Sequence, residues 1–286
     1  MRLNDGCVAC LLKKKLNACP EGADAERVAE YKRRVRAAIE NGRAYSSPEV
    51  NAEVNAIYRE CFGPERDYSA IKRRFNALML GLEPAIQADV DGAADPLARA
   101  AQYAMVGNYI DFAALGDVNE DELRNRLKAA ADMTVDAGTL EALRSDVLAA
   151  RRLVMFTDNC GEIVTDKVLL RTLRRLNPGL RVAVIVRGVP VVNDATLEDA
   201  AQVGMDEVAQ WVIDNGCDLA GTVLTRISGA ALAEVNAADL LIAKGQANYE
   251  GLSGCGRNIY YIFMCKCDLF TRRFGVQRFS GVLTRE

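Results

Sequence analysis

The pattern of hydrophobic and polar residues changes near residue 150 of this chain. Up to that point, apolar residues recur at helical spacing and runs of β-branched residues are nearly absent, which predicts helices. Ser47 is expected to cap one of them, with Pro48 at its first helical position. The predicted helices cover residues 26–41, a segment from residue 48 onward, 67–79, 96–106, 119–131 and 138–149.

Beyond residue 151, short apolar runs alternate with helical segments. This alternation is typical of right-handed crossovers and a parallel sheet. We therefore predict an α/β fold, in which a doubly wound, mostly parallel sheet domain at 151–286 follows an N-terminal helical domain at 1–150. Residues 197–215 are predicted to be helical in part, with a short strand possible at 211–213. The other predicted strands are 153–157, 181–187, 239–243 and 258–264, and the helices among them are 163–176 and 228–235.

Polar side chains follow three of these strands. Asp158 and Asn159 come directly after the first strand. Asn193 and Asp194 lie shortly after the second, and Lys244 follows the apolar run at 240–243. In an open parallel sheet, the carboxyl ends of the strands line one crevice, where ligands bind. Carboxylate and amide oxygens suit a hard divalent cation, and an ammonium suits phosphate.

Each of these segments also has a purely structural explanation, which the sequence leaves open. Asp158 or Asn159 could simply cap the following helix, and Asp194 could cap another. Lys244 could be a solvated residue at the end of a strand. Farther upstream, Asn108 and Asp111 are three residues apart and would share one face of a helix, although a chance polar pair at a helix end is equally compatible.

Composition narrows the possible chemistry. The 286 residues contain no histidine, which excludes Ser-His-Asp and Cys-His catalysis and histidine-ligated zinc. Acid–base chemistry must therefore come from Asp, Glu, Lys, Cys, Tyr or metal-bound water. A formal net charge of −3 argues against a nucleic-acid partner, and no apolar run approaches the roughly 18 residues of a membrane span. Because the first residues lack the apolar stretch of a secretory signal, we expect a cytoplasmic location.

The nine cysteines do not indicate a disulfide framework, since their number is odd and no secretory signal precedes them. Two closely spaced pairs, Cys7/Cys10 and Cys265/Cys267, have spacings compatible with zinc binding or thiol redox chemistry. Packing as free thiols is the alternative that we favour for them.

Four motifs occur together in a characteristic order: Gly-Asn-x-Ile-Asp at 107–111, Asp-Asn-x-Gly-Glu at 158–162, Asn-Asp-Ala-Thr at 193–196 and Lys-Gly-Gln-x-Asn-Tyr-Glu at 244–250. In this combination the chain resembles the metal-dependent damage-control phosphatase family, which has an ARMT-like fold and was long catalogued as a domain of unknown function. The resemblance spans nearly the whole chain, and the two cysteine pairs are similar to those of the microbial branch.

This resemblance implies a divalent-metal-dependent phosphomonoester hydrolase that acts on small phosphorylated metabolites, damaged or surplus. Manganese, magnesium, cobalt or nickel is the expected cofactor. The implied metal ligands are Asp158, Asn159 and Asp194, and the implied catalytic residues are Asp158, Asp194 and Lys244. The implied substrate-binding residues are Asn108, Asp111, Glu162, Arg187, Asn193, Lys244 and Gly245.

Two other functions remain open at this point. The α/β class is compatible with an S-adenosylmethionine-dependent carboxyl methyltransferase, although no glycine-rich nucleotide loop follows the first strand. A thiol-based redox or metal-binding protein is the second, because of Cys7 and Cys10. The sequence determines neither the substrate, nor the preferred metal, nor the choice between a covalent intermediate and direct attack by water, nor the oligomeric state.

Overall fold

One sheet organises the larger part of the molecule, in a computed structural model that describes residues 1–115 and 118–286. Its strand order is β3-β2-β1-β4-β5-β6, and every neighbouring pair is parallel except β5 and β6. The predicted α/β class with a mostly parallel sheet is therefore confirmed. The strands are β1 (Arg152–Phe156), β2 (Arg181–Val186), β3 (Trp211–Asp214), β4 (Leu240–Lys244), β5 (Ile259–Met264) and β6 (Gly281–Arg285).

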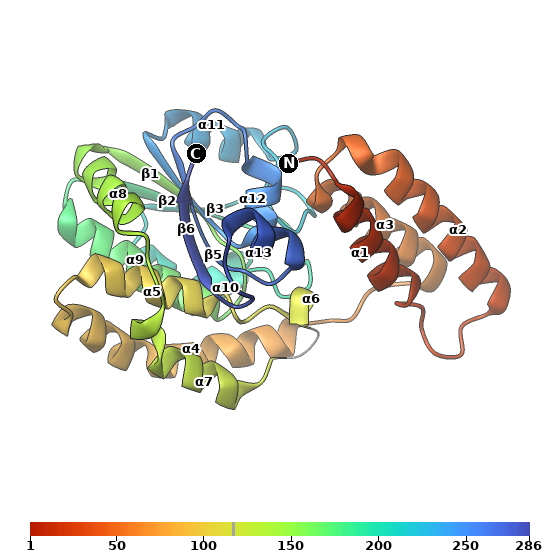
Figure 1. Cartoon of the computed structure of the whole chain (residues 1–286), viewed down its shortest axis with the longest axis horizontal. Helices are drawn as coiled ribbons and strands as arrows, with labels where there is room; N and C mark the ends of the chain where they lie inside the picture. Colours follow the sequence, from red (N-terminus) through yellow and green to blue (C-terminus); the bar gives the residue numbers. More distant parts are fainter. Residues whose placement is uncertain (116–117) are drawn as a thin grey trace.

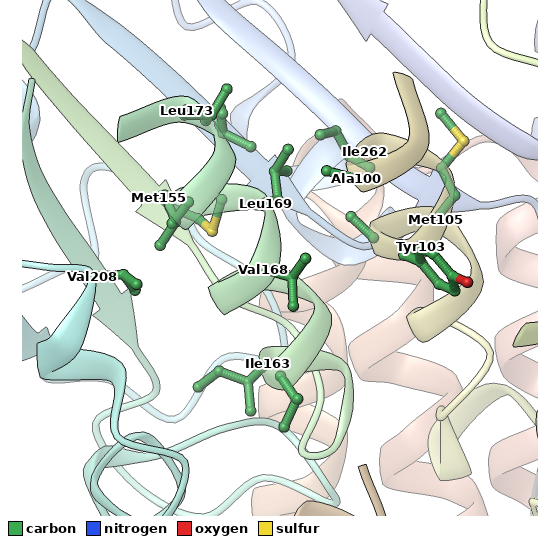
Figure 2. Close-up of a cluster of buried hydrophobic side chains, with 14 of the residues drawn as sticks. Ala100, Tyr103, Met105, Met155, Ile163, Val168, Leu169, Leu173, Val208 and Ile262 are labelled. Atoms are coloured by element: carbon green, nitrogen blue, oxygen red, sulfur yellow. The ribbon is translucent and has the colours of Figure 1, made fainter. Parts of the chain in front are cut away.

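Both faces of the sheet are buried, as their alternating side chains require. Leu153 and Met155 of β1 belong to the core on one face, and Val154 and Phe156 to the core on the other. The first core is shared with α4 (Ser69–Gly92), α5 (Pro96–Gly107), α7 (Glu120–Lys128), α8 (Ala137–Ala149), α9 (Glu162–Leu176) and α10 (Leu197–Gln202). Figure 2 shows part of it, where α9 and α5 pack beside each other on this face of the sheet. The second core is shared with α11 (Gly229–Ala237), α12 (Gln246–Leu252) and α13 (Asp268–Phe274).

The first three helices have a hydrophobic core of their own. They are α1 (Asp5–Leu16), α2 (Ala25–Asn41) and α3 (Ser47–Phe62), and they lie together at one end of the molecule (Figure 1). The helices from α4 onward share the core of the sheet instead. The predicted boundary near residue 150 thus marks the change from helices to alternating strands and helices, whereas the cores change between α3 and α4.

Several predicted helices differ from the observed ones at their ends. α4 continues through Gly81 and Pro84, because its apolar side chains pack against the core on both sides of the proline. α5 ends at Gly107, so Asn108 and Asp111 do not lie on a helix as their spacing suggested. The cap of α3 is Ser46, one residue earlier than predicted, where it forms a capping box with Glu49.

Shorter elements complete the fold. They are α6 (Phe112–Leu115) and the 3₁₀ turns η1 (Gly42–Ala44), η2 (Ala130–Asp132) and η3 (Met205–Glu207). β3 corresponds to the short strand left open near residue 211, whereas α12, α13 and β6 were not predicted. Within the described ranges, no helix combines the length and the apolar character needed to cross a bilayer.

The separate core of α1–α3 leads to a first prediction. Ile39 is fully buried within it, so Ile39→Ala should destabilise this region by about 2–5 kcal/mol through lost burial and a cavity. Hydrogen exchange should accelerate in α1–α3 and remain slow in β1 and β4. Leu169→Ala in α9 serves as the control with the opposite pattern, since Leu169 belongs to the core of the sheet. Equal acceleration in the strands of the Ile39→Ala variant would contradict the idea of separate cores.

Candidate active site

The predicted site residues gather where the strand order reverses. β1 pairs with β2 on one side and with β4 on the other, so its carboxyl end lies at the switch point of the sheet, where doubly wound folds form a crevice. Asp158 and Asn159 follow β1, and Asp194 follows β2. Gly245 follows β4, and Lys266 follows β5. Segments that are more than 100 residues apart in sequence therefore meet at one edge.

Backbone hydrogen bonds join the two acidic loops. Ala195 N–H donates to the Asp158 carbonyl at 2.7 Å, and Cys160 N–H donates to the Asn193 carbonyl at 2.8 Å. Asn159 and Asp194 form an isolated antiparallel bridge between these bonds. The three predicted metal ligands are thus brought together. Their exposed fractions are small, at 6% for Asp158, 2% for Asn159 and 5% for Asp194.

Two amide side chains lie between two buried carboxylates. Asn108 Nδ2 donates to Asp158 Oδ2 at 3.0 Å and to Glu162 Oε2 at 2.8 Å. Asn159 Nδ2 donates to the same two oxygens, at 2.8 Å each. Among the residues that the structure describes, the Oδ1 atoms of Asp158, Asn159 and Asp194 accept no hydrogen bond, and the nearest cation to Asp158 Oδ1 is Arg187 Nη2 at 3.8 Å. Two carboxylate oxygens and one amide oxygen therefore remain available for a hard cation.

These residues do not serve as helix caps, which was the structural explanation that the sequence left open. Gly161 caps α9 without any side-chain hydrogen bond. The cap of α10 is Thr196, which forms a capping box with Asp199. Asp158, Asn159 and Asp194 therefore do not cap these helices.

Negative charge exceeds positive charge around the site. Burial raises the pKa of Asp158 well above its usual value, and the nearby charges of Glu162, Asp194 and Asp111 raise it further. Burial also raises the pKa of Asp194, although the Arg187 guanidinium opposes the shift. The contacting groups comprise five carboxylates and three cations, which leaves two negative charges in excess when all are ionised: Asp111, Asp158, Glu162, Asp166 and Asp194 against Arg187, Lys244 and Lys266. A divalent cation has the charge that this surplus requires.

Lys244 differs from the expectation that its ammonium points freely into the crevice. Its side chain is fully buried, with Nζ 2.7 Å from Glu162 Oε1 and 3.0 Å from Asp166 Oδ1. Nζ also donates to the Ala104 carbonyl at 2.7 Å. Burial by itself would lower the pKa of Lys244, but Asp166 and Glu162 more than offset this and raise it. Lys244 therefore holds Glu162 in place, and its predicted contact with phosphate stays a prediction.

Arg187 and Asn193 support the loop that carries Asp194. Arg187 is 1% exposed, and its Nε lies 2.5 Å from Asp194 Oδ2. The Asn193 side chain donates to the Ile110 carbonyl at 3.0 Å and accepts from Phe112 N–H at 3.2 Å. Both side chains are thus engaged in internal contacts, and their predicted roles in substrate binding remain predictions.

Asp111 pairs with a lysine that was not among the predicted site residues. Lys266 Nζ lies 2.7 Å from Asp111 Oδ2, and its charge acts on Asp158. Unlike Lys244, this ammonium contacts a single carboxylate among the described residues. The signal for Lys266 was present in the sequence, because it follows the apolar run of β5 just as Asp158 follows β1.

Gly245 leaves space for Asp158. A Cβ atom at this position would overlap the Asp158 carboxylate, and the backbone φ of +81° is unfavourable for other residues. The Gly245 N–H donates to the Ile262 carbonyl at 3.2 Å within the sheet, and the predicted role of Gly245 in substrate binding remains a prediction.

The cysteine pairs do not form a metal centre in the described parts of the chain. All nine cysteines are free thiols, with Cys265 buried and Cys10 exposed. No group of three or more Cys, Asp or Glu side chains among the described residues has a metal-binding arrangement. The candidate site differs from such groups because an amide supplies its third oxygen.

The sequence and the fold both resemble those of known proteins. The profile of a family described as the damage-control phosphatase ARMT1-like domain matches residues 3–282. A damage-control phosphatase of Archaeoglobus fulgidus is 31% identical over 287 residues, which cover 96% of this chain and 96% of that protein. A damage-control phosphatase of Pyrococcus horikoshii is 31% identical over 190 residues, or 65% of this chain and 64% of that protein.

A solved structure has the same fold over its whole length. It is the crystal structure of a DUF89 family protein from Pyrococcus horikoshii, with a TM-score of 0.82 and 22% sequence identity. The match covers 100% of this chain and 99% of that one. Together with the family profile, it confirms the resemblance drawn from the four motifs.

Removal of Lys244 tests whether its ammonium holds the buried carboxylates. Lys244→Ala leaves Glu162 and Asp166 without their cation, so we expect the free energy of unfolding to fall by about 3–5 kcal/mol. Denaturant unfolding of the metal-free protein measures this change. Lys14→Ala is the control, because Lys14 is exposed and its loss should cost no more than ~0.5 kcal/mol. If Lys244→Ala were as stable as the wild type, Lys244 would not pair with Glu162 and Asp166 in the protein in solution.

A second pair of variants separates crowding of Asp158 from backbone strain. Gly245→Ala introduces both, whereas Gly254→Ala introduces strain alone, since φ is +80° there and no atom lies within 4 Å of the added Cβ. We expect Gly245→Ala to lose most of the affinity for divalent metal and Gly254→Ala to retain it. Calorimetric titration with Mn²⁺ measures both. Equal affinities would indicate that Asp158 tolerates displacement.

Proposed function

The chain belongs to the damage-control phosphatase ARMT1-like domain family, and on this basis we propose that it is a divalent-metal-dependent phosphomonoester hydrolase acting on small phosphorylated metabolites. One observation carries the metal dependence: the Oδ1 atoms of Asp158, Asn159 and Asp194 accept no hydrogen bond within a described network that has two negative charges in excess.

The proposed metal ligands are therefore Asp158, Asn159 and Asp194, with Mn²⁺, Mg²⁺, Co²⁺ or Ni²⁺ as the cation. Oxygen ligands of this type suit such hard or borderline ions. When bound, the cation would supply charge neutralisation at a phosphoryl oxygen and a lowered pKa for a coordinated water.

The protein's own residues orient these ligands. Glu162 accepts hydrogen bonds from both Asn108 and Asn159, which fixes the two amides. The Asn159 amide is thereby turned so that its nitrogen faces carboxylates, and its oxygen is left for the cation. Glu162 is fixed in turn by Lys244. This chain of contacts gives Lys244 an indirect effect on the metal ligands, in addition to any contact with phosphate.

Lys266 is the cation best placed to meet the anionic substrate. Its ammonium lies beside Asp111 and acts electrostatically on Asp158, whereas Lys244 and Arg187 are fully engaged by buried partners. Because preorganised cations stabilise charge on a transferring phosphoryl group, we assign this role to Lys266 in addition to the predicted Lys244.

A cavity of about 520 Å³ lies next to the Asp194 loop; none of the proposed metal ligands lines it, but it offers space for the body of a small metabolite. Its wall includes Val191, Val192 and Thr196 on both sides of Asp194, and Arg59 of α3. Its charged lining residues are of both signs, which favours a polar ligand over a highly charged polymer. A cytoplasmic location stays a prediction.

Hydrolysis of p-nitrophenyl phosphate tests the proposal. We expect turnover that a chelator abolishes and that Mn²⁺, Mg²⁺, Co²⁺ or Ni²⁺ restores. Asp158→Asn should lower it by about 100-fold, since one negative ligand is lost. Asp206→Asn, at an exposed position remote from the site, should leave it unchanged. Hydrolysis that persists in chelator with full rate would exclude the metal-dependent mechanism.

A further inference from the structure

A buried amide of α4 contacts both acidic loops from outside the site. Asn76 is 0% exposed. Its Oδ1 accepts from Gly161 N–H at 2.6 Å. Its Nδ2 donates to Asp199 Oδ1 at 2.8 Å and to Gln202 Oε1 at 2.9 Å. One side chain thus connects the segment after Asn159 with the start of α10.

The contact with Gly161 fixes the turn that follows the first two metal ligands. Gly161 has a φ of +69° and begins α9 without a side-chain cap. A Cβ atom on it would lie 2.8 Å from Ile110 Cδ1 and 3.3 Å from the Phe75 carbonyl, so the turn packs directly on α4. Without Asn76, the N–H of Gly161 would be buried with no acceptor, which is costly.

The contact with Asp199 fixes the segment that follows Asp194. Asp199 Oδ2 accepts from Thr196 N–H at 2.8 Å and from Thr196 Oγ1 at 2.8 Å. The same oxygen lies 2.6 Å from Lys72 Nζ. The Asn76 amide therefore contacts a charge-paired carboxylate in the first turn of α10, five residues beyond Asp194.

We propose that Asn76 is a positioning residue that sets the separation of the two metal-binding loops and thereby the metal affinity of the site; this rests on the proposed metal ligands. The two direct backbone bonds at Ala195 and Cys160 join the loops to each other, and Lys72 of α4 pairs with Asp199. Asn76 contacts both the segment after Asn159, at Gly161, and the segment after Asp194, at Asp199. Residues that orient metal ligands in this way typically influence affinity by 10- to 100-fold.

The test measures Mn²⁺ binding to metal-free protein without substrate, by calorimetry. Asn76→Leu keeps the branched shape of the side chain and removes all three hydrogen bonds. We expect it to bind Mn²⁺ at least about 10-fold more weakly than the wild type does. At saturating Mn²⁺, turnover should return toward the wild-type value, because Asn76 contacts no reacting group. An unchanged affinity overturns the proposal.

Asn177→Leu is the matched control. Asn177 Nδ2 donates to the Val147 and Ala150 carbonyls at 2.8 Å each, so its loss also removes partly buried hydrogen bonds, but at the opposite end of α9 from Gly161. We expect a comparable drop in melting temperature with wild-type affinity for Mn²⁺. A similar loss of affinity in both variants would show that general destabilisation is the cause and would overturn the positioning role.

A second variant covers the case in which Asn76→Leu does not fold. Asn76→Asp keeps the acceptor for Gly161 N–H but faces Asp199 with a like charge, so a weaker Mn²⁺ affinity is again expected and wild-type affinity again overturns the proposal. If the wild type itself binds no Mn²⁺, the proposed metal site fails and this inference fails with it. That outcome is distinct from equal binding by wild type and variant.

Discussion

The concentration of buried carboxylates at the switch point of the sheet is the constraint on which the site depends. Burying ionised groups is costly unless they are paired, and here four buried carboxylates follow two strand ends: Asp158, Glu162 and Asp166 after β1, and Asp194 after β2. Three cations offset part of this charge, while burial, together with the neighbouring carboxylates, raises the pKa values of Asp158 and Asp194. The uncompensated part is the basis for the proposed binding of a divalent cation.

Helices and strands from both halves of the chain carry the side chains that contact these carboxylates. Helices α4 and α5 share the core on one face of the sheet and bring Asn76 and Asn108 to the loops after β1 and β2. β4 brings Lys244 beneath Glu162, and the segment after β5 brings Lys266 beside Asp111. The rigidity of these contacts comes from packing, because each polar side chain sits on an element whose apolar face is buried. The site is therefore supported by helices from the first half of the chain, which a division at residue 150 would separate from it.

The two lysines are both buried and differ in the number of carboxylates that they contact. Lys244 contacts two carboxylates and a carbonyl and is fully buried, so it stabilises and orients. Lys266 contacts one carboxylate, that of Asp111, so its ammonium can also donate to an anionic ligand. Sequence position alone suggested Lys244 for phosphate, since it follows a strand, and the same reasoning applied to β5 would have suggested Lys266.

Much of the architecture was determined by the sequence itself. The alternation of apolar runs and helical segments after residue 151 predicted the parallel sheet, because residues buried on both faces of a strand form continuous apolar stretches. Polar residues at the carboxyl ends of parallel strands meet in one crevice, and this rule predicted that Asp158, Asn159 and Asp194 lie close together. The short elements α12, α13 and β6 escaped prediction, since their stability comes from contacts with β4 and β5 that local pattern does not encode.

Only the tertiary structure decided which side chains contact each other. The pairing of Lys244 with Glu162 and Asp166, and of Asn76 with Gly161, joins residues separated by about 80 positions. Such pairings depend on how helices pack on the sheet, and hydrophobic periodicity fixes the face that a helix buries without fixing its neighbour. The sequence thus determined the edge of the sheet at which the chemistry lies, and the packing of α4, α5 and α9 determined which groups are free to bind a ligand there.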